Sequence, residues 1–261
     1  MPKTQLWDAE IPETCYHGRV NNLPIPKAIL FDLDDTILDF GGSTDVCWEI
    51  VCERFAPEAC LPAQELNDAI NEYREWYWSD PDRHREGRVR LEDARKDIVR
   101  EAMLRLGVDN RDLADRIGEE YTIARDKALC ILPGAIEALG RLRGMGIRLA
   151  LVTNGPADMQ RGKIERFGLR DYFEFILIEG EFGMGKPDER VYLYVLDQLG
   201  VSPAEAWMVG DNPEWEVAVP QRLGMKGIWY DRRGTGLPAT SRVRPDHIIR
   251  QLDELVSLFL R

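Results

Sequence analysis

The segment KAILFDLDDTILDF, residues 27–40, contains a continuous apolar run and four closely spaced aspartates. A continuous run without polar alternation is typical of a parallel strand that is covered on both faces. Asp32 and Asp34 lie two positions apart at its carboxyl end, so extended backbone points both side chains the same way. Two carboxylates in one pocket repel each other, and a divalent cation offsets that repulsion. One carboxylate can act as nucleophile and the other as proton donor, although the pair alone also fits a solvated acidic turn.

Four more apolar runs have the length of buried strands, and helical patterns fall between them. Helices are predicted over 134–146, 188–200 and 251–261, where apolar residues recur at helical spacing. Strands alternating with helices predict an α/β fold, a doubly wound Rossmann-like parallel sheet. The predicted strands are 27–33, 148–154, 173–178, 206–211 and 226–230.

Residues 41–131 interrupt this alternation, because they contain helical patterns and no convincing strand. An insertion directly after the first strand lies at the carboxyl edge of the sheet, where open α/β sheets bind ligands. The sequence therefore predicts a helical cap over the site. The expected domains are an N-terminal arm at 1–26, a catalytic core at 27–40 and 132–261, and the cap at 41–131.

The amino-acid composition limits the kinds of partner and the cellular location that we expect for this protein. The 261 residues carry a net charge of −12, which disfavours nucleic acid. No apolar run approaches the ~20 residues of a membrane span, and residues 1–18 lack the apolar region of a secretory signal. Five cysteines without a CxxC pair favour free thiols in a reducing cytoplasm. The sequence leaves open whether the protein forms a homodimer.

Three further motifs follow predicted strand ends. Thr153 and Asn154 lie in a strand-to-helix turn whose polar groups can cradle phosphate. Lys186 can supply a fixed positive charge, and Asp211 a further carboxylate for a metal site. Each motif alone also fits an ordinary turn or a solvated lysine, but the carboxyl ends of parallel strands meet at one edge of the sheet.

The ordered set DLDDT, VTNG, GKP and GD, with a helical insertion after the first motif, resembles the haloacid dehalogenase-like (HAD) hydrolase superfamily over roughly residues 27–260. The resemblance implies that Asp32 is the nucleophile and Asp34 the general acid and base. It implies that Thr153, Asn154 and Lys186 bind the phosphoryl group. It also implies that Mg²⁺ is held by Asp32, Asp211 and the backbone carbonyl of Asp34.

One position departs from the family pattern. Many members carry Asp five residues after the position of Asp211, where this chain has Glu216. Glu216 keeps the charge, and we expect it to act behind the metal, through water or Lys186. Glu214 is an alternative for that role.

The pair of aspartates favours one branch of the family, a magnesium-dependent phosphatase that hydrolyses a small phosphomonoester through an aspartyl-phosphate. Members that cleave carbon–halogen bonds usually lack the second Asp, because their leaving group needs no proton. A 2-haloacid dehalogenase stays an alternative. A receiver-type signalling domain, which is about half as long, and a non-catalytic binding protein are others.

The segment REWYWSDPDRHREGRVR, residues 74–90, is the most unusual part of the expected cap. One interpretation of its second half is a basic loop in which Arg85 and Arg88 reach over the substrate and contact an anion. The alternative is a solvated charged loop, with the preceding tryptophans packing the cap on the core.

Overall fold

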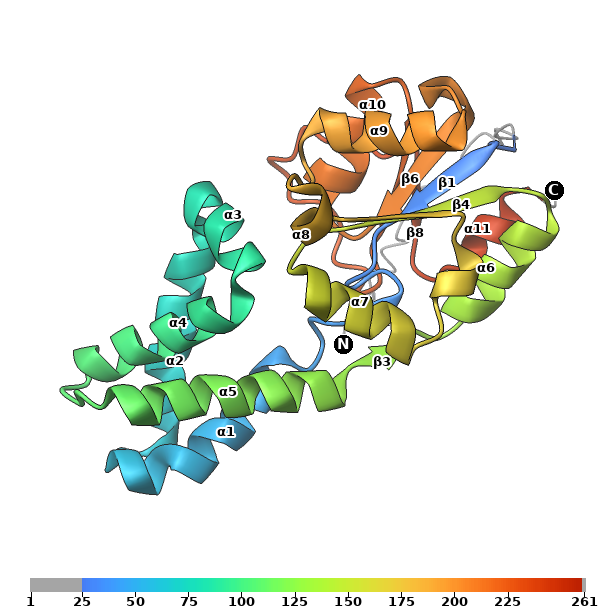
Figure 1. The fold of residues 1–261 in the computed structure, drawn as a ribbon. Coiled ribbons are helices and arrows are strands. Elements are labelled where there is room, and N and C mark those ends of the chain that lie inside the picture. The colour runs from blue at the N-terminus through green and yellow to red at the C-terminus, as the bar shows by residue number, and fades with distance from the viewer. Residues whose placement is uncertain (1–24, 260–261) are drawn as a thin grey trace, which may run out of the picture.

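The computed structural model describes residues 25–259, and its centre is a six-stranded parallel sheet in the order β5-β4-β1-β6-β7-β8 (Figure 1). The α/β Rossmann-like fold predicted from the sequence is confirmed. Each of the five predicted runs contains a strand, and the sixth strand, β8, was not predicted. The strands are β1 Ala28–Phe31, β4 Arg148–Thr153, β5 Phe175–Ile178, β6 Ala206–Gly210, β7 Lys226–Tyr230 and β8 His247–Ile249.

Strand β1 lies at the centre of the sheet, and both of its faces are buried. Ile29 and Phe31 face one apolar cluster, whereas Ala28 and Leu30 face another. This explains the unbroken apolar run, because a strand covered on both sides has no face for polar residues. Helices cover the two faces (Figure 1): α6 Ala135–Gly144, α7 Ala157–Arg166 and α11 Glu254–Ser257 on one, α9 Glu189–Leu199 and α10 Val219–Arg222 on the other.

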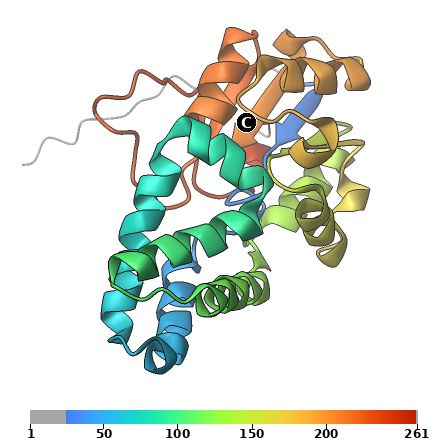
Figure 2. The ribbon, with the colours of Figure 1, turned by 60° about the vertical axis from the view of Figure 1, so that its left-hand side comes forward.

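Between the first core strand and the rest of the sheet, the chain forms five helices with an apolar cluster of their own (Figure 2). Two short strands, β2 Leu38–Asp39 and β3 Cys130–Ile131, pair antiparallel where the chain leaves and re-enters the core. The expectation of no strand in 41–131 is therefore wrong at its last two residues. The helices are α1 Thr44–Ala59, α2 Ala63–Ser79, α3 Pro81–Val89, α4 Leu91–Arg105 and α5 Arg111–Ala128.

The basic segment after Asp80 is a helix, α3, and the predicted loop is wrong. Asp80 caps this helix, since its side chain accepts hydrogen bonds from the backbone N–H groups of Asp82 and Arg83. Pro81 occupies the first turn, where a missing N–H costs nothing. The C-terminal helix is shorter than predicted, but Leu252, Leu255 and Val256 are buried.

The remaining helical segments connect strands of the core. They are α8 Glu179–Phe182, the 3₁₀ turns η1 Arg170–Tyr172 and η2 Pro203–Glu205, and the π-helical turn η3 Pro213–Ala218. The predicted N-terminal arm, residues 1–26, lies outside the described residues except for its last two positions. Within the described residues, no helix is both long and apolar enough to cross a membrane.

Candidate active site

The carboxyl ends of β1, β4 and β6 open into one cavity of about 350 Å³, and residues of the inserted helices, called the cap below, also line it. The residues predicted from separate motifs meet there. Lining it are Asp32, Asp34, Arg88, Thr153, Asn154, Lys186, Asp211 and Glu216. Arg85 does not line this cavity.

Asp32 is held from two sides at the end of β1. Lys186 Nζ donates to Oδ1 at 2.6 Å, and the buried Thr36 hydroxyl donates to Oδ2 at 3.0 Å. Burial raises the pKa of Asp32, and the charge of Lys186 opposes this shift. Each carboxylate oxygen therefore has a fixed direction, as a nucleophile requires.

Asp34 contacts two side chains that the sequence analysis missed. Lys163 Nζ lies 2.8 Å from both carboxylate oxygens, and Gln160 Nε2 donates to Oδ2 at 3.0 Å. Gln160 and Lys163 are three residues apart and share one face of α7. The only sequence signal was a polar pair on an otherwise ordinary helix, so its partner could not be identified without the placement of α7.

The turn after Asp34 directs the remaining aspartates of residues 27–40 to partners of their own. Asp35 adopts the left-handed conformation, with φ 61°. Its carboxylate accepts hydrogen bonds from the backbone N–H groups of Phe40 and Gly41. Asp35 therefore closes its own loop, while Asp39 pairs with Arg232 at 3.0 Å. Two of the four aspartates in the opening segment thus have structural roles.

Lys186 lies between two carboxylates and is 1% exposed. Besides Asp32, it contacts Glu216 Oε1 at 2.8 Å, and Glu216 Oε2 accepts from the backbone N–H of Asn212 at 2.8 Å. Burial alone lowers the pKa of Lys186, but the charges of Asp32 and Glu216 raise it above its ordinary value. The two carboxylates therefore favour the charged form of Lys186.

Glu216 occupies the position expected behind the site, and it reaches Lys186 directly. Burial raises the pKa of Glu216 to about 7, against the opposing charge of Lys186. Glu214 cannot share this role, because its side chain is exposed and lies near Arg222, 3.4 Å away. The alternative assignment to Glu214 is therefore wrong.

Asp211 follows β6 next to these carboxylates. Burial raises its pKa to about 9, and the negative charges of Asp32 and Glu216 contribute to the shift. A side chain at Gly210 would overlap Glu216 and approach Asp32, which explains glycine before Asp211. An ionised Asp211 thus needs more positive charge than Lys186 supplies.

The donor set fits a magnesium ion with few protein ligands. In the described part of the chain, no three His, Cys, Asp or Glu side chains are grouped to hold a metal. Mg²⁺ is commonly held by one or two carboxylates and keeps several waters. Asp32 and Asp211 line the same cavity and are two carboxylates of the kind that such a site uses, whereas the Asp34 side chain contacts Lys163.

Thr153 and Asn154 lie at the end of β4, and their side chains have different hydrogen-bond partners. The Thr153 hydroxyl lines the cavity and accepts a hydrogen bond from Gln160 Nε2 at 2.6 Å. The Asn154 amide instead contacts the backbone of Lys186, accepting from its N–H at 2.8 Å and donating to its carbonyl at 2.7 Å. The Asn154 side chain therefore positions the Lys186 loop.

Arg88 connects the cap to the core. Its guanidinium forms a bidentate pair with Glu179, at 2.6 Å and 2.9 Å, and both side chains are largely buried. Glu179 also accepts from the backbone N–H of Gly155 at 3.0 Å. Arg85 points to solvent, with its side chain 63% exposed and paired with Asp82. Only one of the two predicted cap arginines reaches the cavity.

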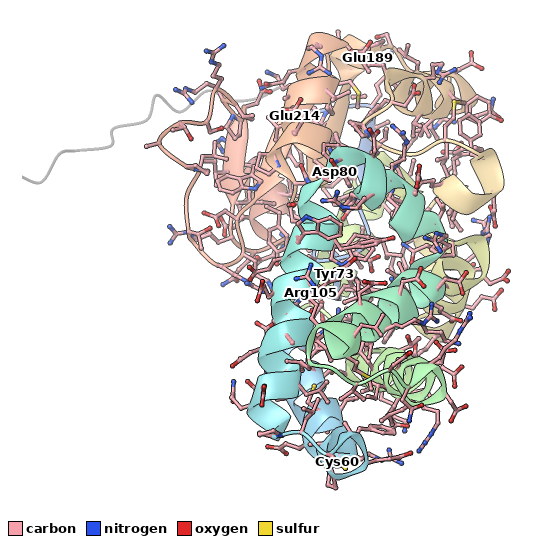
Figure 3. The ribbon with its side chains drawn as sticks, turned by 90° about the vertical axis from the view of Figure 1, so that its left-hand side faces the viewer. Cys60, Tyr73, Asp80, Arg105, Glu189 and Glu214 are labelled. Carbon is pink, nitrogen blue, oxygen red and sulfur yellow. The ribbon has the colours of Figure 1, made fainter. Side chains whose placement is uncertain are left out.

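An aromatic series lies beside this contact. His84 packs edge-on against Trp78 of the cap and Trp215 of the core, with ring centroids 5.5 Å and 5.6 Å away. Figure 3 shows Asp80, at the start of α3, near the core segment that carries Glu214, whereas Cys60 lies at the far end of the cap. The cap therefore covers the site through the turn between α2 and α3.

The fold and the site agree with the comparison to known families. The model of the haloacid dehalogenase-like hydrolases matches residues 26–224. The chain belongs to this hydrolase family.

Two relatives show which activities occur among similar chains. Phosphoserine phosphatase from Thermus thermophilus is 41% identical over 126 residues, which cover 48% of this chain and 49% of the relative. This chain therefore matches about half the length of that relative. N-acylneuraminate-9-phosphatase from Rattus norvegicus is 26% identical over 251 residues, covering 89% of this chain and 93% of the relative.

Solved structures show the same fold along nearly the whole chain. The putative HAD-hydrolase YfnB from Bacillus subtilis, bound to magnesium, is 20% identical with a TM-score of 0.69, covering 90% of this chain and 99% of that one. The 2-haloacid dehalogenase from Pseudomonas syringae is 29% identical with a TM-score of 0.60 and the same coverage.

Proposed function

We propose that the protein is a magnesium-dependent phosphatase that hydrolyses a small phosphomonoester through an aspartyl-phosphate intermediate. The observation that carries this proposal is a second carboxylate, Asp34, that lines the same cavity as Asp32 and has defined contacts with Lys163 and Gln160. A displaced alkoxide needs a proton, and we assign its donation to Asp34.

The reaction has two steps in this proposal. A carboxylate oxygen of Asp32 forms a bond to phosphorus as the ester P–O bond breaks, and the leaving oxygen takes a proton from Asp34. Water then attacks phosphorus, Asp34 takes its proton, and the bond from phosphorus to Asp32 breaks to release inorganic phosphate. Asp34 thus returns to its starting protonation state.

The other groups stabilise charge on the transferring phosphoryl group. Lys186 presents a charge fixed by Asp32 and Glu216, and the Thr153 hydroxyl contributes a donor at the same wall. Asp32, Asp211 and the carbonyl of Asp34 would hold Mg²⁺, which when bound supplies further positive charge to the phosphoryl oxygens. Asn154 supports this arrangement by positioning the Lys186 loop.

A 2-haloacid dehalogenase is the second candidate, because a dehalogenase is among the similar structures. Halide leaves without protonation, so that reaction has no use for Asp34. The contacts of Asp34 favour the phosphatase. The same proposal places the enzyme in the cytoplasm, with a small phosphorylated metabolite as its substrate and neither nucleic acid nor a membrane surface as a partner. The four cysteines in the described part of the chain are all free thiols.

The test is phosphate release from a panel of phosphomonoesters, measured with Mg²⁺, with a chelator, and for the variant Asp32→Asn. We expect turnover of at least one ester that requires both Mg²⁺ and Asp32. Chloride or bromide release from 2-haloacids, with no phosphate release from any ester, would contradict the phosphatase and support the dehalogenase.

A further inference from the structure

A second cavity, of about 250 Å³, lies inside the cap and has an unusual charge. Three arginines line it: Arg74 from α2, Arg95 from α4 and Arg125 from α5. Arg95 is 6% exposed and Arg125 is 5% exposed. Buried guanidinium groups are costly unless an anion lies beside them.

Within residues 25–259, neither buried arginine has a carboxylate at ion-pair distance, although the charges of Glu92 and Asp34 act on Arg95 from farther away. Arg95 donates to the Thr122 hydroxyl at 3.0 Å, and Arg125 donates to the Ser43 hydroxyl and the Phe40 carbonyl, all of which are neutral. Arg74 pairs with Asp45, but that carboxylate is mostly exposed on the surface. The cavity therefore has an excess of positive charge.

Several donors at this cavity have no hydrogen-bond partner. Across the described part of the chain, few buried side-chain atoms lack one, and three of them belong to residues that line this cavity: Trp48 Nε1, Arg74 Nη1 and Arg125 Nε. Native proteins rarely leave buried donors unpaired unless a ligand or water satisfies them. Two of these three donors belong to arginines of the cavity, and guanidinium N–H groups without a partner are suited to bind an anionic oxygen group.

The cap cavity adjoins the catalytic cavity. Phe40, Trp78 and Leu91 line both. The Phe40 ring lies between the two sites, with Lys163 Nζ 4.1 Å and Arg125 Cζ 4.6 Å from its centroid. Lys163 also contacts Asp34, so the cap cavity lies on the side of the catalytic cavity that carries the proposed general acid.

We propose that the cavity between Arg74, Arg95 and Arg125 binds a second anionic group of the substrate, carried by the alcohol part of the phosphomonoester. This inference rests on the proposed phosphatase function and narrows its substrate class. Carboxylate and phosphate share the chemistry that the arginines recognise. An ester of a neutral alcohol leaves the three donors and the positive charge without a partner.

Matched esters test the proposal. Phosphate esters of ω-hydroxyalkanoic acids are compared with alkyl phosphates of the same chain length, and with bisphosphates of the corresponding diols, over a series of increasing length. We expect the full-length protein to prefer an anionic ester by at least about tenfold in kcat/KM at one chain length, equivalent to roughly 1.4 kcal/mol. The carboxylate and bisphosphate series show which anion is preferred.

The variants are Arg95→Met and Arg100→Met, both on α4. Arg100 does not line the cavity and pairs with Asp97 and Asp115. We expect Arg95→Met to bring the ratio of kcat/KM for anionic and neutral esters close to one, Arg95→Lys to keep part of the preference, and Arg100→Met to keep the wild-type ratio. Thermal unfolding checks that each variant is folded.

Two results overturn the proposal. One is phosphate release from both kinds of ester with equal kcat/KM at every chain length. The other is an equal loss on both kinds of ester in folded Arg95→Met. Failure of the phosphatase function looks different, because then no ester releases phosphate. Calorimetric titration of wild type and Arg95→Met with the carboxylate esters then decides, and equal binding by both proteins rejects the anion site.

Discussion

Asp34 is the residue on which the choice of reaction depends. Lys163 and Gln160 hold its carboxylate from α7, so the proton donor has a defined position in the cavity before substrate enters. Thr36 and Lys186 hold Asp32 in the same way. The two aspartates thus have different partners, which is how two neighbouring carboxylates acquire different roles.

Replacing Asp34 by Asn tests this role. We expect Asp34→Asn to lower kcat for alkyl phosphates by about 10²–10⁴, because the alkoxide then leaves without a proton. An ester with an acidic alcohol, such as p-nitrophenyl phosphate, should lose much less in the first step. Formation of the phosphoenzyme and release of phosphate are measured separately. Wild-type turnover of alkyl phosphates by this variant would refute the assignment.

Glu216 is expected to act through Lys186. Glu216→Gln removes one of the two charges that hold Lys186, and we expect kcat to fall by about tenfold or more with the Mg²⁺ requirement retained. Glu214→Gln is the matched control, since Glu214 is two residues away and exposed. Steady-state phosphate release measures both variants. An equal loss in the control would show that the effect comes from net charge near η3.

At the scale of elements, the short helix α3 brings cap and core together. Arg88 binds Glu179 on α8, while Trp78 and Trp215 flank His84. The cap has an apolar cluster of its own, separate from the two clusters of the core. The Arg88–Glu179 pair is therefore a specific contact between two separately packed units.

Removing this contact should affect substrate binding. We expect Arg88→Ala to raise KM by about tenfold, because Glu179 loses its partner and the cap no longer closes in the same position. Arg85→Ala is the control and should leave KM unchanged, since Arg85 pairs with Asp82 at the surface. Initial rates over a range of substrate concentration give both values. Unchanged KM in Arg88→Ala would mean that this pair does not control closure.

His84 makes stability depend on pH. Burial lowers the pKa of His84 below its ordinary value of 6.5, and the charge of Arg88 lowers it further. The unfolded chain therefore binds a proton at a higher pH than the native protein, so His84 contributes stability above about pH 6.5 that is lost as pH falls.

The measurement is the free energy of unfolding in denaturant at a series of pH values, for wild type and His84→Phe. We expect wild type to lose more stability than the variant between neutral and mildly acidic pH. Phe keeps a planar ring between the tryptophans and cannot titrate. Parallel pH profiles for the two proteins would contradict the prediction.

At the scale of the whole molecule, folding brings several carboxylates that repel one another together at the site. Asp32, Asp211 and Glu216 come from different segments, and Lys186 is the cation that contacts two of them. A cation held by Asp32 and Asp211 would stabilise the native state, because the unfolded chain does not bring these two carboxylates together. Metal binding should therefore be visible in stability as well as in activity.

Thermal unfolding tests this coupling. We expect Mg²⁺ to raise the Tm of wild type by several degrees and to leave the Tm of Asp211→Asn nearly unchanged. Without Mg²⁺, Asp211→Asn should unfold at the same temperature as wild type or higher, because it removes a half-buried carboxylate next to the carboxylates of Asp32 and Glu216. A shift with Mg²⁺ of the same size in both proteins would place the ion elsewhere.

The order of motifs along the chain was enough to predict five of the six core strands, a mostly helical insertion and the site at the strand ends, but not β8 or helix α3. Apolar runs such as Ala28–Phe31 identify buried strands, and polar residues at their carboxyl ends must meet at one edge of a parallel sheet. These features are local in sequence. The physical rule that joins them, common strand direction, does not depend on detailed packing.

Other features depend on packing between distant segments, and only the tertiary structure decided them. Lys163 meets Asp34 across 129 positions, and Arg88 meets Glu179 across 91. Arg95 and Arg125 are ordinary basic residues in sequence, and burial without a counter-ion distinguishes them. The sequence by itself determined which chemistry lies at the sheet edge, since that follows from strand ends. The burial and pairing of each charged side chain depend on how helices pack in three dimensions, and no local pattern encodes that.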